Sequence, residues 1–588
     1  MNNNENNEFT TKNSIYNIEN INTYFKLPVF YNNSKVELKK NIAIDLELTD
    51  TVDLSANPIY SFCFNNFNKQ ELSRKIFPQL SNFYTTDISF LKDTQDIIKK
   101  YNCNDNKYVN YSPNYEKILK IWCELKNDSS FKEKYYYIEW DALEFLNNSE
   151  HFLLTSCLYN ILSPIVALLS IVFIFIIPFF ILKMKGLHIS VRQYVDVLKI
   201  IAKNNAIGKM LTADFANINI NQLIYLIAST GFYVFSVYQN ITTCIKFNKN
   251  METIHNHLIE TNLYLQKTMV TIENYLELSS SYDTQKEFNF VLREKYVILQ
   301  ELQQKVSSLS EYNFYDIKKY LEFGKALKYF YELHENKTYN EAILYSFGFN
   351  GYIDCLEGLK QNIETNQINF ATFVYDSKKT NMKNSYYACL KDSNPIKNNI
   401  KLNKNITITG PNASGKTTVL KATMINLIIT QQFGCGFYDS AKICPYDYMH
   451  CYLNIPDTSG RDSLFQAEAR RCKNIIDEVN YNINKRHFCV FDELFSGTNP
   501  DEAITSATSL MMYLIKHKNV TCLLTTHFIK VCKNLRKNKN VSNCKMVIKH
   551  NENKLIYTYK LNNGISDIKG GLHILSEMNF PSAIINNK

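Results

Sequence analysis

The 588-residue sequence lacks the patterns that mark structural zinc sites and disulfide-rich secreted proteins. Its 15 cysteines are scattered, with no Cys-x-x-Cys pair and no Cys/His cluster at zinc-ligand spacing. The polar, Asn-rich start carries no basic segment followed by an apolar run, so we expect no secretory signal peptide. Cysteines used in this way in a long chain indicate free thiols in a reducing compartment.

Length and net charge leave several classes of protein open. The length suits about two to four domains, and hydrophobic and charged fractions of 45% and 21% are those of a folded protein. A net charge of +9 permits contact with nucleic acid or an anionic membrane. A slightly basic surface without a polyanionic partner is the alternative.

Charged residues are absent from Phe152–Leu182, a stretch of 31 positions. About 20 apolar residues suffice for a helix to cross a bilayer. The alternative is a buried helix of a large core, but such helices rarely run this long without a charge. We therefore expect a membrane segment here, and Pro164 and Pro178 would allow a kink or a re-entrant hairpin in it.

A second charge-free stretch runs from Phe215 to Ile245, with an apolar centre at residues 223–238 and more interspersed polar residues. The linker between the two stretches, residues 183–214, is basic: Lys183, Lys185, Arg192, Lys199, Lys203 and Lys209 stand against Asp196 and Asp214. Basic loops favour the cytoplasmic side of a membrane. Two crossings would place this linker outside, whereas a re-entrant first stretch with an interfacial second one would keep it inside, and both arrangements stay open.

The strongest local motif lies at Gly410–Thr417, where G-x-x-x-x-G-K-[ST] follows a β-branched run and precedes an apolar helix. In this setting glycines let backbone N–H groups surround a phosphate, and the helix N-terminus adds its dipole. We expect Lys416 to reach the β- and γ-phosphates of ATP and Thr417 to offer its hydroxyl to Mg²⁺. The predicted phosphate-binding residues are Gly410, Pro411, Asn412, Ala413, Ser414, Gly415, Lys416, Thr417 and Thr418.

Two later strands are predicted to complete this site. Four apolar residues, 488–491, form a buried strand that ends in Asp492 and Glu493, at the kind of edge where ligands gather in α/β sheets. Asp492 would hold Mg²⁺, and Glu493 would act as the general base on the attacking water. Another buried strand, 520–526, ends in His527, which could sense the γ-phosphate, although a lone histidine there is more often structural.

These motifs resemble the ATPase domain of the MutS family, the DNA mismatch repair branch of the ABC-type ATPases. Thr409–Thr418 reads TGPNASGKTT, with Asn412 as the distinguishing residue, and Gln432–Cys435 fits the next family segment. A later signature is matched in order by Asp457, Gly460, Ser463, Phe465 and Glu468, and the family's closing segment by Tyr559–Leu561, Gly564 and Phe580-Pro581. The likeness is specific from Thr409 to about Phe528 and fainter upstream.

The resemblance implies a homodimer with composite ATP sites, in which Ser463 of one subunit contacts the nucleotide bound by the other. It also implies a Q-loop role for Gln432, DNA binding, and a helical core whose motion follows ATP binding. Three departures from the family pattern matter. We expect the chain to begin at the helical core without a mismatch-recognition domain, Tyr386-Tyr387 replaces a His-Pro pair, and hydrophobic segments stand where DNA-gripping parts are expected.

The predicted architecture is an α/β ABC-type ATPase domain at the C-terminus plus an all-α core interrupted by one or two membrane segments. Its parts are a polar leader (1–35), two halves of the helical core (36–150 and 251–385), a membrane region (151–250) and the ATPase domain (386–588). We expect a membrane-associated ATPase that binds DNA, with its ATPase domain in the cytoplasm. The alternative is a membrane-anchored mechanical ATPase that does not bind DNA. A transporter ATPase is disfavoured because no LSGGQ-like signature occurs.

Overall fold

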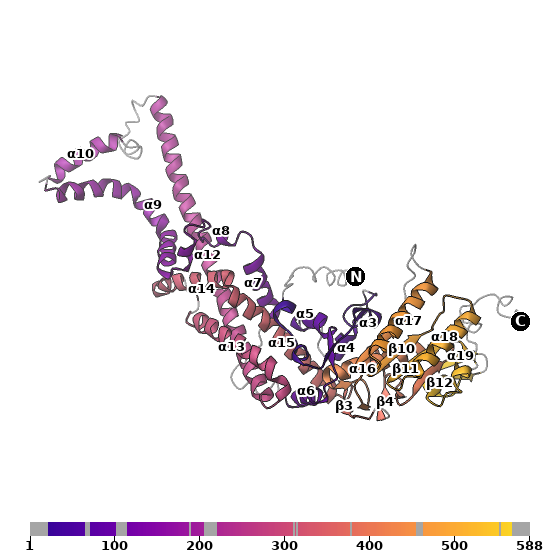
Figure 1. Ribbon diagram of the computed structural model, residues 1–588. Coiled ribbons are helices and arrows are strands. Elements are labelled where there is room, and N and C mark those ends of the chain that lie inside the picture. Colours follow the sequence, from indigo (N-terminus) through magenta and orange to yellow (C-terminus); the bar gives the residue numbers. More distant parts are fainter. Residues whose placement is uncertain are drawn as a thin grey trace. The chain divides into compact units, whose positions relative to one another are not determined.

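The computed structural model describes residues 21–53, 55–64, 71–101, 114–186, 190–204, 220–309, 312, 316–376, 379–453, 463–551, 554–566 and 568 (Figure 1). The chain forms two compact units, each considered by itself. The first unit comprises residues 1–17, 111–267 and 297–341, and the second comprises residues 18–110, 268–296 and 342–588.

A six-stranded sheet forms the centre of the C-terminal part of the second unit. Its strand order is β13 (Lys554–Asn563), β12 (Val541–Asn551), β6 (Asn405–Thr409), β11 (Val520–Thr526), β10 (His487–Asp492) and β9 (Tyr448–Tyr452). All neighbours pair in parallel except β13, which is antiparallel to β12. The α/β class predicted for this part is confirmed, and so are the three buried strands at 405–409, 487–492 and 520–526.

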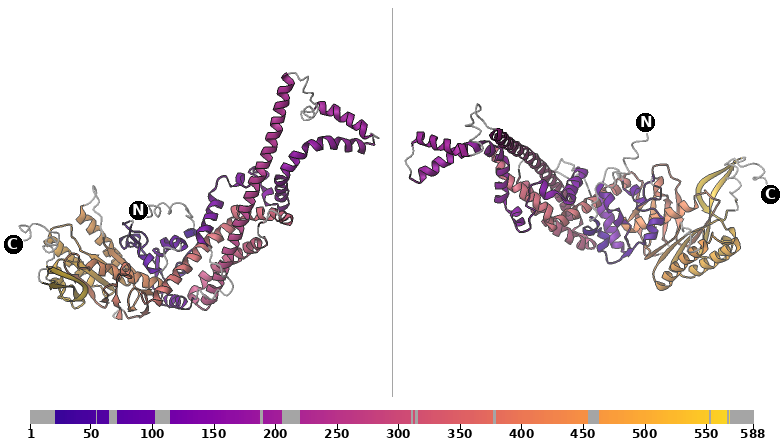
Figure 2. Two further views of the ribbon diagram at one scale, coloured as in Figure 1. Left: turned by 180° about the vertical axis from the view of Figure 1, so that it is seen from behind. Right: turned by 90° about the horizontal axis from the view of Figure 1, so that it is seen from above.

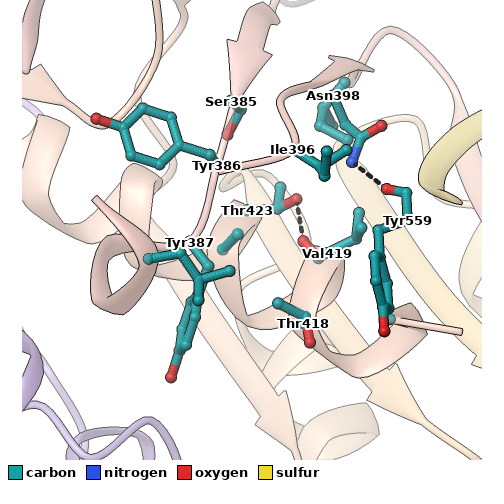
Figure 3. Close-up of a pocket in the computed structure, with 13 residues that line it drawn as sticks. Ser385, Tyr386, Tyr387, Ile396, Asn398, Thr418, Val419, Thr423 and Tyr559 are labelled. Carbon is teal, nitrogen blue, oxygen red and sulfur yellow. Dashed lines mark hydrogen bonds between the residues drawn. The ribbon is translucent and has the colours of Figure 1, made fainter. Parts of the chain in front are cut away.

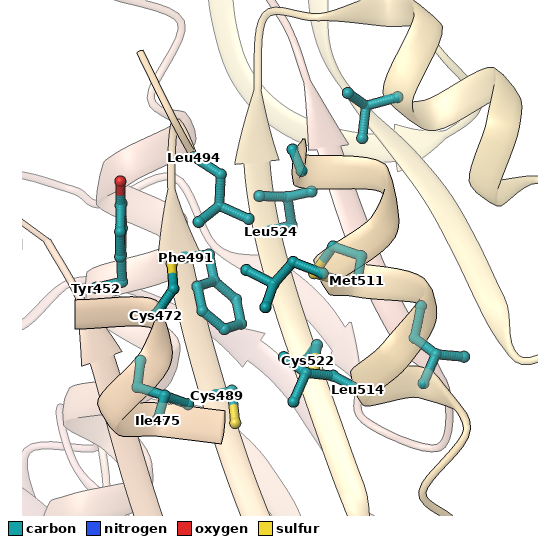
Figure 4. Packing of buried hydrophobic residues seen from close by; sticks show 14 of the residues in the cluster. Tyr452, Cys472, Ile475, Cys489, Phe491, Leu494, Met511, Leu514, Cys522 and Leu524 are labelled. Atoms are coloured by element: carbon teal, nitrogen blue, oxygen red, sulfur yellow. The ribbon is translucent and has the colours of Figure 1, made fainter. Parts of the chain in front are cut away.

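Helices cover both faces of this sheet, so its strands are buried on both sides. One face carries α17 (Leu464–Tyr481), α18 (Pro500–Ile515) and α19 (Ile529–Leu535). Their apolar side chains pack on Phe491 and Leu524, as Figure 4 shows. Phe488 and Val490 alternate with these positions and are buried on the opposite face, where α16 (Lys416–Phe433) packs.

A smaller sheet stands beside the six-stranded one in the same unit. Its order is β5 (Asn398–Lys401), β4 (Asn381–Ser385), β8 (Ser440–Ile443), β3 (Asn369–Phe373) and β7 (Cys435–Gly436), and the short η8 (Ala388–Leu390) follows β4. The N-terminal segment of this unit contains α2 (Ile21–Tyr24), η1 (Pro28–Tyr31), β1 (Lys35–Glu37), α3 (Lys40–Asp45), α4 (Ile59–Cys63), α5 (Glu71–Leu80), β2 (Phe83–Thr85) and α6 (Ile88–Lys100). Strands β1 and β2 pair antiparallel.

The N-terminal segment packs directly on the part of this unit that holds the six-stranded sheet, residues 386–588, which we call the ATPase-like part. Buried Gln431 donates to the Thr85 and Tyr446 carbonyls at 3.1 and 2.9 Å, and Gln95 donates to the Gly434 carbonyl at 2.6 Å. The predicted helical core, residues 36–150 and 251–385, is divided between the two units. Residues 18–110, 268–296 and 342–385 lie in the same unit as the ATPase-like part, and the contacts of Thr85 and Gln95 are among those that join them to it.

The first unit is helical. It contains α7 (Tyr115–Asn127), α8 (Phe131–Lys134), η4 (Glu144–Asn148), α9 (Glu150–Met184), α10 (Val191–Asn204), η6 (Ile317–Glu322) and α14 (Phe323–Glu335). Three further helices are shared between the two units: α12 (Ile220–Ser279), α13 (Lys286–Ser307) and α15 (Lys337–Glu364). The short η5 (Asp283–Gln285) lies in the second unit. Leu299, Leu302 and Val306 recur at helical spacing in α13 and are buried, so this side of the helix belongs to the core.

An arm made by α9, α10 and the start of α12 leaves the rest of the first unit (Figures 1 and 2). The two long helices touch where Tyr233 Oη donates to the Ala167 carbonyl at 3.2 Å and Cys244 Sγ to the Ile161 carbonyl at 3.6 Å. Among the described residues one stretch, Glu150–Leu169, is long and apolar enough to cross a bilayer, with a mean hydropathy of 1.9 and little burial. This result rests on length and composition alone, so the membrane segments stay a prediction. Part of the basic linker, 205–214, lies outside the described residues.

Candidate nucleotide site

The loop between β6 and α16 adopts the conformation that the glycine-rich motif predicts. Gly415 caps α16 with φ +92°, and Ala413 has φ +62°, both in the left-handed region. A Cβ on Gly410 would lie 2.7 Å from Ser414 Oγ, so only glycine fits at that position. The loop therefore turns tightly at the N-terminus of a long helix, which is the arrangement that binds phosphate.

Lys416 is the buried cation of this loop. Its Nζ donates to the Gly410 and Pro411 carbonyls at 2.9 and 3.2 Å and lies 3.5 Å from Glu493 Oε1. The side chain is only 5% exposed. A buried ammonium that is held mainly by neutral carbonyls gains from an additional anion, because burial has removed its hydration. A phosphate is an anion of suitable size and charge.

Asp492 lies beside Thr417, as the sequence predicts for a magnesium site. The Thr417 hydroxyl donates to Asp492 Oδ2 at 2.9 Å and lies 3.2 Å from Oδ1. Thr525, at the end of the neighbouring strand β11, also donates its hydroxyl to this carboxylate. A hydroxyl and a carboxylate at the tip of the sheet are ligands that Mg²⁺ prefers, so this donor set fits the ion.

Glu493 follows Asp492 at the same edge of the sheet. Its Oε2 lies 3.7 Å from His527 Nδ1, so the structure brings the predicted base and the predicted histidine together. The neighbouring His527 ring, aided by the Lys416 charge, lowers the pKa of the Glu493 carboxyl, while partial burial opposes this. With a lowered pKa the carboxyl is ionised near neutral pH, and the ionised form is the one that can accept a proton.

Ser463 begins α17 as its N-cap. Its side chain accepts from the Gln466 N–H, and Gln466 in turn caps the Ser463 N–H, so the two form a capping box. Ser463 itself is exposed, as a residue that meets a partner must be. Asp457 and Gly460 of the same signature lie outside the described residues, as do Phe580 and Pro581.

Glu468 of the signature has a role that the sequence did not predict. It is buried, accepts from the Ser496 hydroxyl at 3.1 Å, and lies 3.4 Å from the Gly497 N–H. These contacts hold the turn that follows Glu493. Helix α17 and the turn that follows β10 are thereby linked within one chain.

The structure does not bring Gln432, the predicted Q-loop residue, to the nucleotide loop. Gln432 lies near the C-terminus of α16, about 24 Å along the helix from Lys416 at 1.5 Å per residue. Its amide nitrogen donates to the Leu80 and Phe83 carbonyls at 2.5 and 3.1 Å, and its oxygen accepts from Tyr60 at 3.1 Å. The glutamine is buried as a structural link, so it has no free group for a nucleotide.

A cavity of about 270 Å³ adjoins the loop at Gly415 and Thr418. Tyr387, Ile396 and Tyr559 contribute to its walls (Figure 3). Asn398 orders one wall, since its amide donates to the Tyr559 carbonyl at 3.0 Å and accepts from the Leu561 N–H at 2.8 Å. A mostly apolar cavity of this kind suits a flat heterocycle. The sequence showed Tyr387 as a departure from the family pattern and Tyr559 in its closing segment, but only the fold places them together.

Comparisons with known proteins find relatives for part of this chain. The family model of MutS domain V matches residues 406–588. The DNA mismatch repair protein MutS of Parabacteroides distasonis is 28% identical over 248 residues, which cover 40% of this chain and 28% of that protein. MutS of Persephonella marina is 26% identical over 230 residues, covering 38% of this chain and 26% of that protein. MutS protein homolog 4 of Mus musculus is 30% identical over 203 residues, covering 32% of this chain and 21% of that protein.

The matched region thus spans only about a quarter of the length of these curated relatives. The family-model match begins within β6 and includes the loop, Asp492, Glu493 and His527. The C-terminal part of this chain is similar to MutS domain V, and these likenesses support a place in the MutS family.

Proposed function

We propose that this protein binds and hydrolyses ATP with Mg²⁺ at the loop between β6 and α16. The observation that carries the proposal is the arrangement around this loop: Thr417 lies 2.9 Å from Asp492, and Lys416 lies 3.5 Å from Glu493. Similarity to MutS domain V supports the same activity. The cavity lined by Tyr387, Ile396 and Tyr559 would take the base of the nucleotide.

In this proposal Lys416 turns from the Gly410 and Pro411 carbonyls to the β- and γ-phosphates of ATP. Thr417 and Asp492 would hold Mg²⁺, which when bound neutralises charge that develops on the phosphates. Glu493 accepts a proton from the attacking water, and His527 keeps the carboxylate ionised and oriented.

The test is the substitution Glu493→Gln, which keeps the size of the side chain and removes its basicity. We expect ATP binding to persist and turnover to fall by about 100-fold or more. ATP should then accumulate on the protein, and sedimentation with ATP should show a stable dimer. A wild-type rate of phosphate release in this variant would contradict the assignment of Glu493 as the base.

The dimer is part of the proposal. Its supports are the exposed position of Ser463 and the resemblance to a family in which this serine closes the partner's site. Closure would be favoured by contacts to the γ-phosphate and reversed by hydrolysis. Ser463→Arg should keep ATP binding in the monomer and prevent the ATP-dependent dimer, whereas an unchanged dimer would exclude this serine from the interface.

DNA binding is proposed because the curated relatives include proteins named for DNA mismatch repair. The test is binding of purified protein to matched, mismatched and branched DNA over a range of salt concentrations. A protein that contacts phosphates loses affinity linearly in log salt. The absence of binding at low salt would favour the alternative, a membrane-anchored mechanical ATPase that does not bind DNA.

Membrane association is proposed on the apolar arm, with the ATPase domain in the cytoplasm. Large apolar side chains are exposed along α9, although a helix in water normally buries one stripe: they include Ile165, Val166, Leu168, Ile176, Ile177 and Phe180. The start of α12 exposes others, among them Ile224, Ile227, Phe232, Val234 and Phe235. The cysteines of the described residues are all free thiols, which supports a reducing compartment for the rest of the chain.

A further inference from the structure

The net charge of this protein is concentrated in one stretch of the chain. Residues 503–551 contain nine lysines and arginines and no aspartate or glutamate. The rest of the sequence holds 56 basic and 56 acidic residues, so the whole formal charge of +9 resides in these 49 positions. A solvated surface usually mixes both signs, whereas a one-sign field attracts an oppositely charged partner.

The fold gathers most of this charge at one edge of the six-stranded sheet. Strands β6, β9, β10, β11 and β12 are parallel, so their amino ends meet at the edge opposite to Asp492 and Glu493. The loop before β12 is fixed there because the Asn405 N–H donates to the Asn540 carbonyl at 2.9 Å. The loop before β11 is fixed there because the His487 N–H donates to the Asn519 carbonyl at 2.9 Å.

Six basic side chains on three of these loops form what we call the basic edge: Lys404, Lys516, Lys518, Arg536, Lys537 and Lys539. All six are exposed. Within the described part of the chain none of them has a carboxylate within 4.0 Å, unlike Lys485 nearby, whose Nζ lies 3.6 Å from Asp447. Their charge is therefore not neutralised by the protein's own acids.

The groups around the basic edge match a nucleic acid better than a lipid surface. The exposed asparagines Asn403, Asn534 and Asn540 stand among the basic residues, and their amides can donate to phosphate oxygens. Tyr481, which ends α17 at the same edge, is 89% exposed and offers a ring on which a base can stack. A membrane-binding surface needs several exposed apolar side chains to insert, and the loop before β10 exposes a single one, Ile483.

We propose that the basic edge binds the phosphodiester backbone of a nucleic acid. The proposal rests on the DNA-binding part of the proposed function and assigns its contact surface to the ATPase-like part itself. Because the contacts are to phosphate, binding depends on charge and not on base sequence. The nucleotide site at the opposite edge stays open to ATP, since the length of the seven-residue β11, about 23 Å, separates the two edges.

The experiment measures binding of the full-length protein to a labelled duplex and to the corresponding single strand over a range of KCl concentrations. Two double variants remove charge from different loops: Lys516→Gln with Lys518→Gln, and Lys537→Gln with Lys539→Gln. The matched control is Lys383→Gln with Lys442→Gln, two exposed lysines on β4 and β8 of the smaller sheet. Each basic-edge pair should weaken binding about tenfold or more and reduce the log–log salt slope by about two, while the control stays close to wild type.

The ATPase rate without nucleic acid should be unchanged in all three double variants, which shows that they are folded. If wild-type protein binds DNA and both basic-edge pairs bind equally well, this assignment is overturned while DNA binding stands. If wild-type protein does not bind DNA at low salt, this assignment and the DNA part of the proposed function both fall, and the ATPase part is unaffected. If the basic-edge pairs lose binding to phosphatidylserine vesicles but not to DNA, the partner is a membrane and the assignment is wrong.

Discussion

At the scale of single residues, the carboxyl end of β10 holds two non-glycine residues in a left-handed backbone conformation. Glu493 has φ +50° and Phe495 has φ +58°. Such residues cost about 1 kcal/mol or more each and persist where surrounding contacts over-determine them. The Glu493 N–H donates to the Thr525 carbonyl at 3.0 Å, and Glu468 holds the following turn. The strain therefore falls on the residue that we propose as the catalytic base.

The pair of Glu493 and His527 predicts a change in the pH dependence of hydrolysis. His527 is the largest cause of the lowered pKa of Glu493, so His527→Ala should raise that pKa toward its ordinary value. Hydrolysis needs the ionised carboxylate, so the acid limb of kcat against pH should move to higher pH in the variant. His517→Ala, a histidine of the α18–β11 loop, is the control. An acid limb at the same pH in wild type and variant would show that His527 does not act on Glu493.

At the scale of elements, α16 connects the nucleotide loop to the N-terminal helical segment. Fifteen of its 18 residues are buried, so the helix cannot shift without moving its neighbours. Its N-terminus carries Lys416, and near its C-terminus Gln431 and Gln432 hydrogen-bond to residues 80–85. A displacement of the loop on ATP binding would therefore reach the helical segment through this one helix.

The C-terminal cap of α16 gives a prediction about stability. Gly434 has φ +74°, and a Cβ there would lie 2.5 Å from Gln95 Cγ. Gly434→Ala should lower the free energy of unfolding by about 2–4 kcal/mol, because it combines a disfavoured backbone conformation with overpacking. Gly564→Ala is the control for the backbone alone, since its φ is +125° but the nearest atom lies 3.5 Å away. Equal loss of stability in the two variants, measured by denaturant unfolding, would mean that the Gln95 contact costs nothing.

At the scale of the whole molecule, the apolar arm is the feature on which the proposed membrane association rests. The contacts of Ile161 with Cys244 and of Ala167 with Tyr233 tie the base of the arm together. Both ends of the arm return to the first unit, so any membrane crossings must be even in number. A two-crossing hairpin and a re-entrant hairpin both satisfy this condition.

The arm predicts that alkaline carbonate leaves the expressed protein in the membrane pellet. Joining Ile161 to Cys244 through a short Gly-Ser linker removes the arm where its helices already touch. This shortened protein should appear in the supernatant and keep its ATPase activity, because the nucleotide site lies in the other unit. Release of the full-length protein by carbonate would refute integral insertion.

The sequence by itself determined the nucleotide loop, the strand-tip pair Asp492–Glu493 and the α/β class around them. These features follow from contiguous residues, since a β-branched strand, a glycine-rich turn and a helix start fix their own backbone geometry. The tertiary structure alone decided the position of Gln432, because helix length and not sequence proximity sets its distance from the loop. It also decided the cavity of Tyr387, Ile396 and Tyr559, the grouping of residues 18–110 with the ATPase-like part, and the basic edge. Those features join residues far apart in the chain, and only the packing of the sheet and its helices brings them together.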